Sequence, residues 1–258
     1  RSFHAENACK LIHEHHADTT VVVPLMVYKM IRYNTEYLKS LTCIACGGSE
    51  LNPESAAEIL EKLGDALFNL YGTSEAGLTT IATPQDLKAA SDTIGRKIPG
   101  VRLKILDQQG KRVPTGKTGG FYVKTRWSMR NKKSSWILTG DMGYRDRSGR
   151  YFLYGRADDM IVSGGENVFP AEVERILASH PQVAQAAVIG VNDENFGQRL
   201  KAFILLHENS VVSQEELFEW LRTRIARFQT PREIVFVESM PCTPLGKLDR
   251  KQLQRIGY

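Results

Sequence analysis

The stretch Ala66-Leu-Phe-Asn-Leu-Tyr-Gly-Thr-Ser-Glu-Ala-Gly77 joins an apolar segment to a run of small polar residues. The apolar half predicts a strand, and the polar half then lies beyond its carboxyl end, where α/β sheets bind ligands. Tyr71 offers a flat ring for a base, and Glu75 offers an oxygen for Mg²⁺. Thr73 and Ser74 offer hydroxyls for a phosphate. A turn after a strand, with glycine and a capping hydroxyl, explains the same residues equally well.

The chain on the N-terminal side of this stretch alternates strands with helices. Periodicity and capping residues predict a helix over Phe3–Ile12, strands over Thr19–Val23 and Leu38–Ala45, and a helix from Pro53 to Leu63 with Asn52 as its N-cap. Such alternation favours a parallel sheet covered by helices, and we assign residues 1–92 to an α/β region.

The pattern changes near Asp92, where short alternating strands replace the helical periodicity. Strands are predicted over Val101–Leu106 and Gly120–Thr125, and a hairpin over Tyr144–Gly155 turns at Asp146-Arg-Ser-Gly149. Residues 93–155 therefore form a small β-barrel-like region or an antiparallel sheet.

The last hundred or so residues predict a separate α+β unit. Its expected elements are a helix over Pro170–Ala178, strands over Val183–Val191, Leu200–Leu206 and Ile234–Val237, and a helix that begins at a Ser213/Glu216 capping box and extends its apolar stripe to Phe228.

Composition restricts the class of protein. With 258 residues, 42% hydrophobic and 24% charged, the chain is long enough for a globular core, and it contains no apolar run that spans a bilayer. The net charge of +5 comes from Lys and Arg interleaved with Asp and Glu along most of the chain, which favours a mildly basic enzyme over a nucleic-acid partner. Cys43 and Cys46 have the spacing of a metal or redox pair, but a buried strand is the favoured interpretation, and the cysteine pattern suits a reducing cytoplasm.

Three further motifs carry candidate chemistry, each beside a plainer explanation. Asp141 in Thr139-Gly-Asp141 is a natural acceptor for ribose hydroxyls, although the triplet is also a common turn. Gly164 and Gly165 allow close approach of another surface, or form a bulge. Lys247, after Pro244 and Gly246, is able to reach an anion, or belongs to a solvated basic tail.

Taken together, six segments resemble the adenylate-forming superfamily of acyl-CoA synthetases, nonribosomal adenylation domains and luciferases. They are Cys46-Gly-Gly-Ser-Glu-Leu51, Tyr71-Gly-Thr-Ser-Glu75, Thr139-Gly-Asp141, Gly155-Arg-Ala-Asp-Asp159, Ser163-Gly-Gly-Glu-Asn-Val-Phe-Pro170 and Pro244-Leu-Gly-Lys247. The resemblance implies that residues 1–155 are the later part of a large, N-terminally truncated domain, and that residues 156–258 are a mobile C-terminal domain.

The resemblance also implies roles for individual residues. The nucleotide-binding set is Gly47, Gly48, Ser49, Tyr71 against adenine, Gly72, Thr73, Ser74 at the α-phosphate, and Asp141 and Arg156 at ribose. The remaining implied roles are Mg²⁺ binding by Glu75, a hinge at Asp158, a CoA tunnel at Gly164 and Gly165, and contact of Lys247 with the reacting carboxylate and α-phosphate. Lys247, Glu75 and Ser74 form the implied catalytic set.

Three functions follow as hypotheses. An acyl-CoA synthetase, which uses ATP, CoA and a fatty or aryl acid, is preferred because Gly164–Pro170 looks like the CoA ligases and no carrier domain follows Tyr258. An adenylation domain that loads a carrier protein is the alternative, and a non-catalytic binding domain is the third. The family's phosphate loop lies upstream of all the segments seen here and is absent from this chain, so the chain alone is expected to be inactive.

Overall fold

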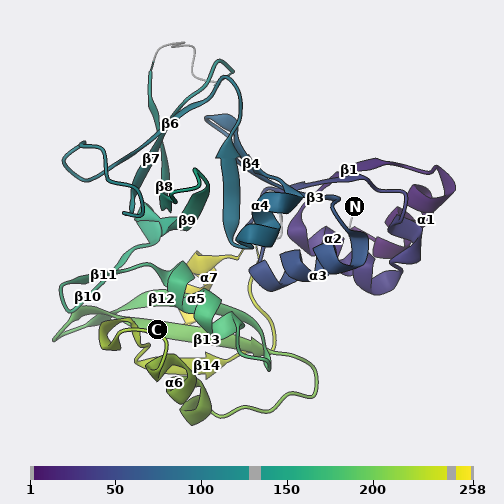
Figure 1. Ribbon diagram of the computed structural model, residues 1–258. Helices are drawn as coiled ribbons and strands as arrows, with labels where there is room; N and C mark the ends of the chain where they lie inside the picture. The colour runs from purple at the N-terminus through teal and green to yellow at the C-terminus, as the bar shows by residue number, and fades with distance from the viewer. Residues whose placement is uncertain (1–2, 128–134, 243–247, 257–258) are drawn as a thin grey trace. The chain divides into compact units, whose positions relative to one another are not determined.

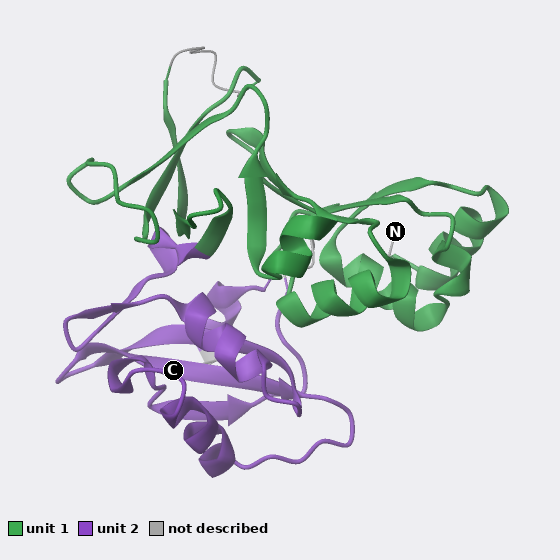
Figure 2. Ribbon diagram, in the orientation of Figure 1, with its two compact units in different colours: residues 1–153 green, residues 154–258 purple. Residues whose placement is uncertain are grey.

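The computed structural model describes residues 3–127, 135–242 and 248–256 (Figure 1). The chain divides into two compact units, Arg1–Leu153 and Tyr154–Tyr258 (Figure 2). The family resemblance predicts a domain boundary between residues 155 and 156 and a mobile second domain. The mobility of that domain stays a prediction.

The first unit begins with a parallel α/β layer. Its strands β1 (Thr19–Val22), β2 (Cys43–Gly47) and β3 (Leu67–Thr73) run parallel, and the helical segments of the layer are α1 (Ala5–Glu14), α2 (Pro24–Tyr33), η1 (Glu36–Leu38), α3 (Pro53–Leu63) and α4 (Pro84–Ala89) (Figure 1). Buried side chains from α1, α2, α3, β2 and β3 form one core cluster. The predicted parallel sheet with helices is confirmed.

Local sequence accounts for most of these boundaries. The Asn52 side chain accepts hydrogen bonds from the amides of Glu54 at 2.8 Å and Ser55 at 3.3 Å, so α3 begins where the sequence predicts. The strand predicted over Leu38–Ala45 is partly wrong, because β2 begins only at Cys43. Leu38 is fully buried in a 3₁₀ turn, and an apolar run alone does not distinguish such a turn from a strand.

Antiparallel strands continue the same sheet. They are β4 (Gly77–Ala82), β5 (Thr93–Lys97), β6 (Arg102–Leu106), β7 (Gly119–Lys124), β8 (Ile137–Arg145) and β9 (Tyr151–Arg156). The sheet has nine strands in the order β1-β2-β3-β4-β5-β9-β8-β7-β6. The region is antiparallel as expected, and its described strands extend the α/β layer as an open sheet and do not close into a barrel.

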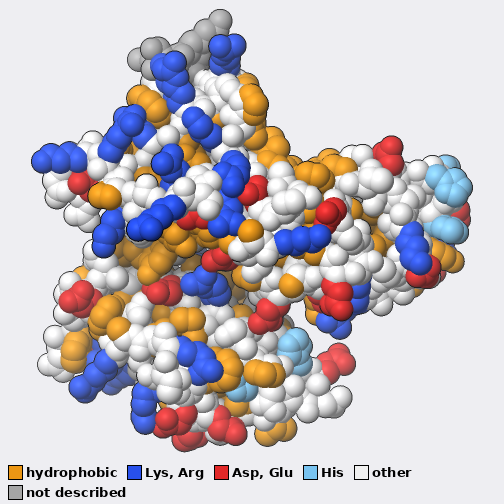
Figure 3. Space-filling model, in the orientation of Figure 1, with side chains coloured by type: hydrophobic (Ala, Val, Ile, Leu, Met, Phe, Trp, Pro, Cys, Tyr) orange, Lys and Arg blue, Asp and Glu red, His pale blue; other side chains and the backbone are white. Residues whose placement is uncertain are grey.

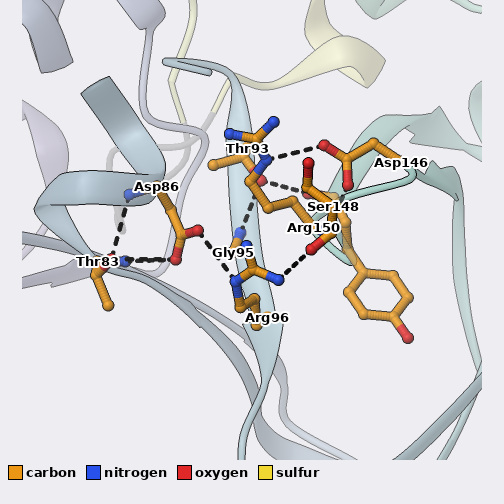
Figure 4. Close-up of polar contacts among 9 residues, drawn as sticks. Thr83, Asp86, Thr93, Gly95, Arg96, Asp146, Ser148 and Arg150 are labelled. Carbon is orange, nitrogen blue, oxygen red and sulfur yellow. Dashed lines mark hydrogen bonds and ion pairs between the residues drawn. The ribbon is translucent and has the colours of Figure 1, made fainter. Parts of the chain in front are cut away.

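A polar cluster joins α4, β5 and the β8–β9 turn (Figure 4). Asp86 completes a capping box with Thr83 and accepts a hydrogen bond from Arg96 Nε at 3.2 Å. Arg96 also donates to the Ser148 carbonyl. The Thr93 hydroxyl donates to the Tyr151 carbonyl at 2.8 Å and is itself buried. These contacts fix the antiparallel strands against the α/β layer.

The second unit is a mixed five-stranded sheet with helices. Its elements are η2 (Ala157–Asp159), β10 (Ile161–Ser163), β11 (Glu166–Val168), α5 (Pro170–Ala178), β12 (Val183–Asp193), β13 (Gly197–Leu206), α6 (Gln214–Arg222), η3 (Arg227–Gln229), β14 (Glu233–Phe236) and α7 (Arg250–Ile256). The Ser213/Glu216 capping box is present, but α6 ends at Arg222 and leaves Phe228 in η3.

The glycine at position 95 gives a test of this architecture. Gly95 has a φ of +80°, and a Cβ there would lie 2.0 Å from the Ile81 carbonyl oxygen in β4. Gly110 has a similar φ of +75° with no atom within 4 Å of an added Cβ. Gly95→Ala should therefore lower the free energy of unfolding by about 3 kcal/mol or more, against about 1–2 kcal/mol for Gly110→Ala. Urea denaturation measures both, and equal losses would contradict the close packing of β5 on β4.

Candidate functional site

Two of the predicted segments leave neighbouring strands at the same sheet edge. Gly47, the last residue of β2, lies opposite Leu70 in β3, and the two strands run parallel. The Gly47–Ser49 segment and the turn after Tyr71 therefore begin side by side. A Cβ on Gly47 would come within 2.8 Å of the Leu70 carbonyl oxygen, so glycine is needed for this approach.

Hydrogen bonds inside the β3–β4 turn hold its shape. The Thr73 hydroxyl accepts from the Ala76 amide at 3.2 Å, and the Ala76 carbonyl accepts from the Thr125 hydroxyl at 2.9 Å. A Cβ on Gly72 would lie 2.4 Å from the Gly77 carbonyl oxygen, so the turn is also tightly closed. This arrangement leaves the Ser74 and Glu75 side chains exposed at the sheet edge.

A buried hydrogen bond connects this edge to the antiparallel strands. The Tyr71 hydroxyl donates to Asp141 Oδ2 at 2.5 Å, and each residue is only 9% exposed. The Asp141 amide in turn donates to the Thr139 hydroxyl at 3.1 Å, which explains the threonine two residues before the aspartate. The Tyr71 ring meets Phe121 edge to face, with 6.2 Å between ring centroids.

The remaining predicted residues fall in the second unit. Arg156 and Asp158 form an exposed ion pair at 3.1 Å. Gly164 and Gly165 form the turn between β10 and β11 with φ values of +60° and +86°, a conformation that favours glycine. Lys247 lies outside the described residues. The first unit thus brings together Gly47–Ser49, Tyr71–Glu75 and Asp141, while Arg156, Asp158 and the two glycines belong to the second unit.

Trp127 is a residue that sequence reasoning did not single out. Its ring lies over Gly77, where an added Cβ would come within 2.7 Å of the indole, and it also approaches Gly100. Trp127 is 45% exposed and therefore forms part of the surface beside the β3–β4 turn. Its position depends on contacts with residues about 27 and 50 positions earlier, so no local pattern reveals it.

The cysteine pair is placed within a strand. Residues alternate between the two faces of β2, so Cys43 and Cys46, three positions apart, point to opposite faces. Cys46 is fully buried, and burial raises the pKa of its thiol to about 12. It is therefore protonated at neutral pH. Within the described part of the chain, no three His, Cys, Asp or Glu side chains gather as a metal cluster.

Models of known families match both units. Residues 1–131 match the AMP-binding enzyme family, and residues 172–247 match the AMP-binding enzyme C-terminal domain. The chain belongs to the AMP-binding enzyme family. The family resemblance predicted from the sequence motifs is thereby confirmed. None of the described helices has the length and apolar character needed to cross a membrane.

Curated relatives and solved structures agree with this membership. The chain is 32% identical to a medium/long-chain-fatty-acid–CoA ligase of Mycobacterium tuberculosis, covering 98% of this chain and 48% of the relative. It is also 32% identical to an indoleacetate–CoA ligase of Aromatoleum aromaticum, with 98% and 52% covered. The amide bond synthetase McbA from Marinactinospora thermotolerans superposes with a TM-score of 0.93 at 28% identity, over 100% of this chain and 56% of that one.

One further solved structure contains a reaction intermediate. It is the o-succinylbenzoate CoA synthetase of Bacillus subtilis in complex with its acyl-adenylate, with a TM-score of 0.86 and 29% identity over 98% of this chain and 54% of that one. The chain spans about half the length of the relatives that it matches.

The Tyr71 hydroxyl gives a test of the site's geometry. Tyr71→Phe removes the donor to the buried Asp141 carboxylate, so the free energy of unfolding should fall by about 1–3 kcal/mol. Tyr122→Phe is the matched control, because Tyr122 is a half-buried tyrosine of β7, the strand beside the Asp141 strand β8, with no hydrogen bond from its hydroxyl among the described residues. Urea denaturation that shows the same loss for both variants would mean that the Tyr71–Asp141 bond contributes nothing specific.

Proposed function

We propose that the protein is an ATP-dependent acyl-CoA synthetase, which converts a carboxylic acid to its acyl-adenylate and then transfers the acyl group to CoA. The main support is the Tyr71–Asp141 hydrogen bond beside the exposed Ser74 and Glu75, in a chain of the AMP-binding enzyme family. The relatives are ligases for fatty, indoleacetic and succinylbenzoic acids, so the substrate class we propose is a carboxylic acid activated for thiol attack.

In this proposal the nucleotide lies along the sheet edge. Tyr71 presents its ring to adenine, and the Gly47–Ser49 backbone follows the nucleotide closely because Gly47 and Gly48 carry no Cβ. Gly72 and Thr73 keep the next turn in shape, and Ser74 contacts the α-phosphate. Asp141, oriented by the Tyr71 hydroxyl, accepts hydrogen bonds from the ribose, with Arg156 as a second ribose contact.

The first half-reaction brings two anions together, because a carboxylate attacks the α-phosphorus of ATP. Positive charge is needed where the negative charge accumulates. Glu75 fits a Mg²⁺ ligand: it is an exposed carboxylate at this edge, and Mg²⁺ is commonly held by one or two carboxylates together with substrate phosphates. The ion would offset phosphate charge when bound. Lys247 supplies an ammonium to the carboxylate and α-phosphate.

The second half-reaction needs a different surface around the adenylate. We propose that Asp158 is the hinge about which residues 156–258 rotate, and its exposed position next to Arg156 leaves it free of core packing. Rotation would replace Lys247 by the Gly164–Gly165 turn. The absence of side chains on that turn leaves room for the narrow pantetheine arm of CoA to approach.

A carrier protein is the alternative acyl acceptor. A fatty acid–[acyl-carrier-protein] ligase of Streptomyces coeruleorubidus is 32% identical over 98% of this chain and 52% of its own length. The phosphopantetheine arm of a carrier ends in the same thiol as CoA, so the same site chemistry serves either acceptor. The two functions differ in the thiol that attacks the acyl-adenylate and thereby releases AMP: that of CoA or that of the carrier protein.

Lys247 gives the decisive experiment. In the intact protein, Lys247→Ala should slow adenylate formation by on the order of a hundredfold or more, because a single preorganised electrostatic group is lost. Thioester formation from supplied acyl-adenylate should stay near normal, because rotation carries Lys247 away from the reacting atoms. Pyrophosphate release measures the first step, and AMP release with CoA or a holo-carrier protein measures the second.

Lys251→Ala is the matched control, because it removes an exposed lysine four positions further along the chain. It should leave both steps unchanged. A fall in both half-reactions for Lys247→Ala would make the lysine structural and contradict the two-conformation mechanism. Faster AMP release with the carrier than with CoA would replace the proposed acceptor by the alternative.

A further inference from the structure

Basic residues are concentrated in one part of the chain. Residues 93–153 contain fifteen Lys and Arg but only three Asp and no Glu, whereas the rest of the chain contains nineteen Lys and Arg and twenty-six Asp and Glu. The three aspartates are engaged locally: Asp141 is buried against Tyr71, Asp146 pairs with Arg150, and Asp107 accepts the Lys111 amide. Figure 3 shows Lys and Arg side chains gathered over the part formed by β6–β9. The modest net charge of the whole chain conceals this concentration.

The outward face of β6, β7 and β8 carries part of this charge beside aromatic and aliphatic groups. Arg102 lies opposite Lys124, Lys104 lies opposite Tyr122, and Tyr122 lies opposite Leu138 in the neighbouring strand. Between them on the other face, Val123 is buried and Leu103 is half-buried. We call this set, together with Trp136, the basic sheet face; its members are Arg102, Lys104, Tyr122, Lys124, Trp136 and Leu138.

This arrangement is unfavourable for folding. Like charges directly opposite each other in an antiparallel pair destabilise it, and Arg102 and Lys124 are such a pair. Among the described residues, Arg102, Lys104 and Lys124 form no ion pair with a carboxylate. Leu138 is 58% exposed and Trp136 is 37% exposed. A local pattern that opposes stability in this way commonly marks a functional surface.

We propose that the basic sheet face docks on an anionic lipid bilayer. Lys and Arg near an anionic membrane are attracted to its headgroups, and Trp and Tyr favour the level where headgroups meet acyl chains. Leu138, next to Tyr122, is positioned to enter the acyl region. The proposal is independent of the proposed ligase activity.

Nucleic acid fits this face less well. The Lys104 ammonium lies 4.2 Å from the centroid of the Trp136 ring and 5.6 Å from that of Tyr122. These aromatic faces are therefore engaged by a cation and are poorly placed to stack bases, as single-strand binders require. The exposed aliphatic Leu138 adds to lipid binding and contributes little to contact with a phosphate backbone.

Vesicle co-sedimentation of the 258-residue chain tests the proposal. The chain should bind vesicles of phosphatidylcholine with phosphatidylglycerol, and bind much less to phosphatidylcholine alone. Arg102→Glu with Lys104→Glu should weaken binding by on the order of tenfold or more, because two attractions become repulsions. The first of these exchanges places a carboxylate opposite Lys124, so the sheet is not expected to lose stability from it. Leu138→Ser should weaken vesicle binding by about threefold or more.

Lys29→Glu with Lys251→Glu is the matched control, because it makes the same change in net charge at exposed lysines outside the basic sheet face. It should bind nearly as well as the unchanged chain. Three results would overturn the proposal: no vesicle binding, equal losses for the two double variants, or binding that Leu138→Ser leaves unchanged. Tight binding of a single-stranded oligonucleotide without vesicle binding would assign the face to nucleic acid instead.

Discussion

The hydrogen bond from the Tyr71 hydroxyl to the Asp141 carboxylate is the contact on which the candidate site depends. It joins residues 70 positions apart, one at the carboxyl end of a parallel strand and one within an antiparallel strand, and both are nearly inaccessible to solvent. A buried carboxylate needs strong partners, since an unsatisfied charged group is costly. The position of Asp141 relative to the β3–β4 turn is therefore tightly constrained.

That constraint explains how an open nine-stranded sheet gathers the residues of the candidate site. The parallel strands bring Gly47–Ser49 and the β3–β4 turn to one edge, and the antiparallel extension supplies a carboxylate from the other side of Tyr71. The polar cluster around Arg96 and Thr93 holds this extension against α4 (Figure 4). Catalytic roles for Ser74, Glu75 and Lys247 build on this frame as proposals, and so does the placement of a nucleotide along it.

Local signals in the sequence predict the helices that begin at a capping residue or at a proline. Asn52 and Ser213 cap their helices where the sequence places them, and Pro170 begins α5. The predicted start of β2 is wrong, because Leu38 in the 3₁₀ turn and Leu41 just after it are both buried and give the same apolar pattern as a strand. The motifs also predict that Tyr71 and Asp141 serve one site, although their direct bond depends on strand order, which no local pattern contains. Trp127 and the basic sheet face are not predicted, because their surroundings also depend on strand order and on contacts between distant residues.

The most direct test of this account is a calorimetric titration of the intact protein with AMP and with 2′,3′-dideoxy-AMP. Asp141→Asn keeps the side-chain shape and an acceptor for Tyr71 but removes the charge that would bind the ribose hydroxyls. We expect Asp141→Asn to weaken AMP binding by about tenfold or more and to leave dideoxy-AMP binding unchanged, and we expect Asp107→Asn to change neither. Equal affinities of the Asp141→Asn variant and the unchanged protein for AMP would contradict the placement of a nucleotide at this edge.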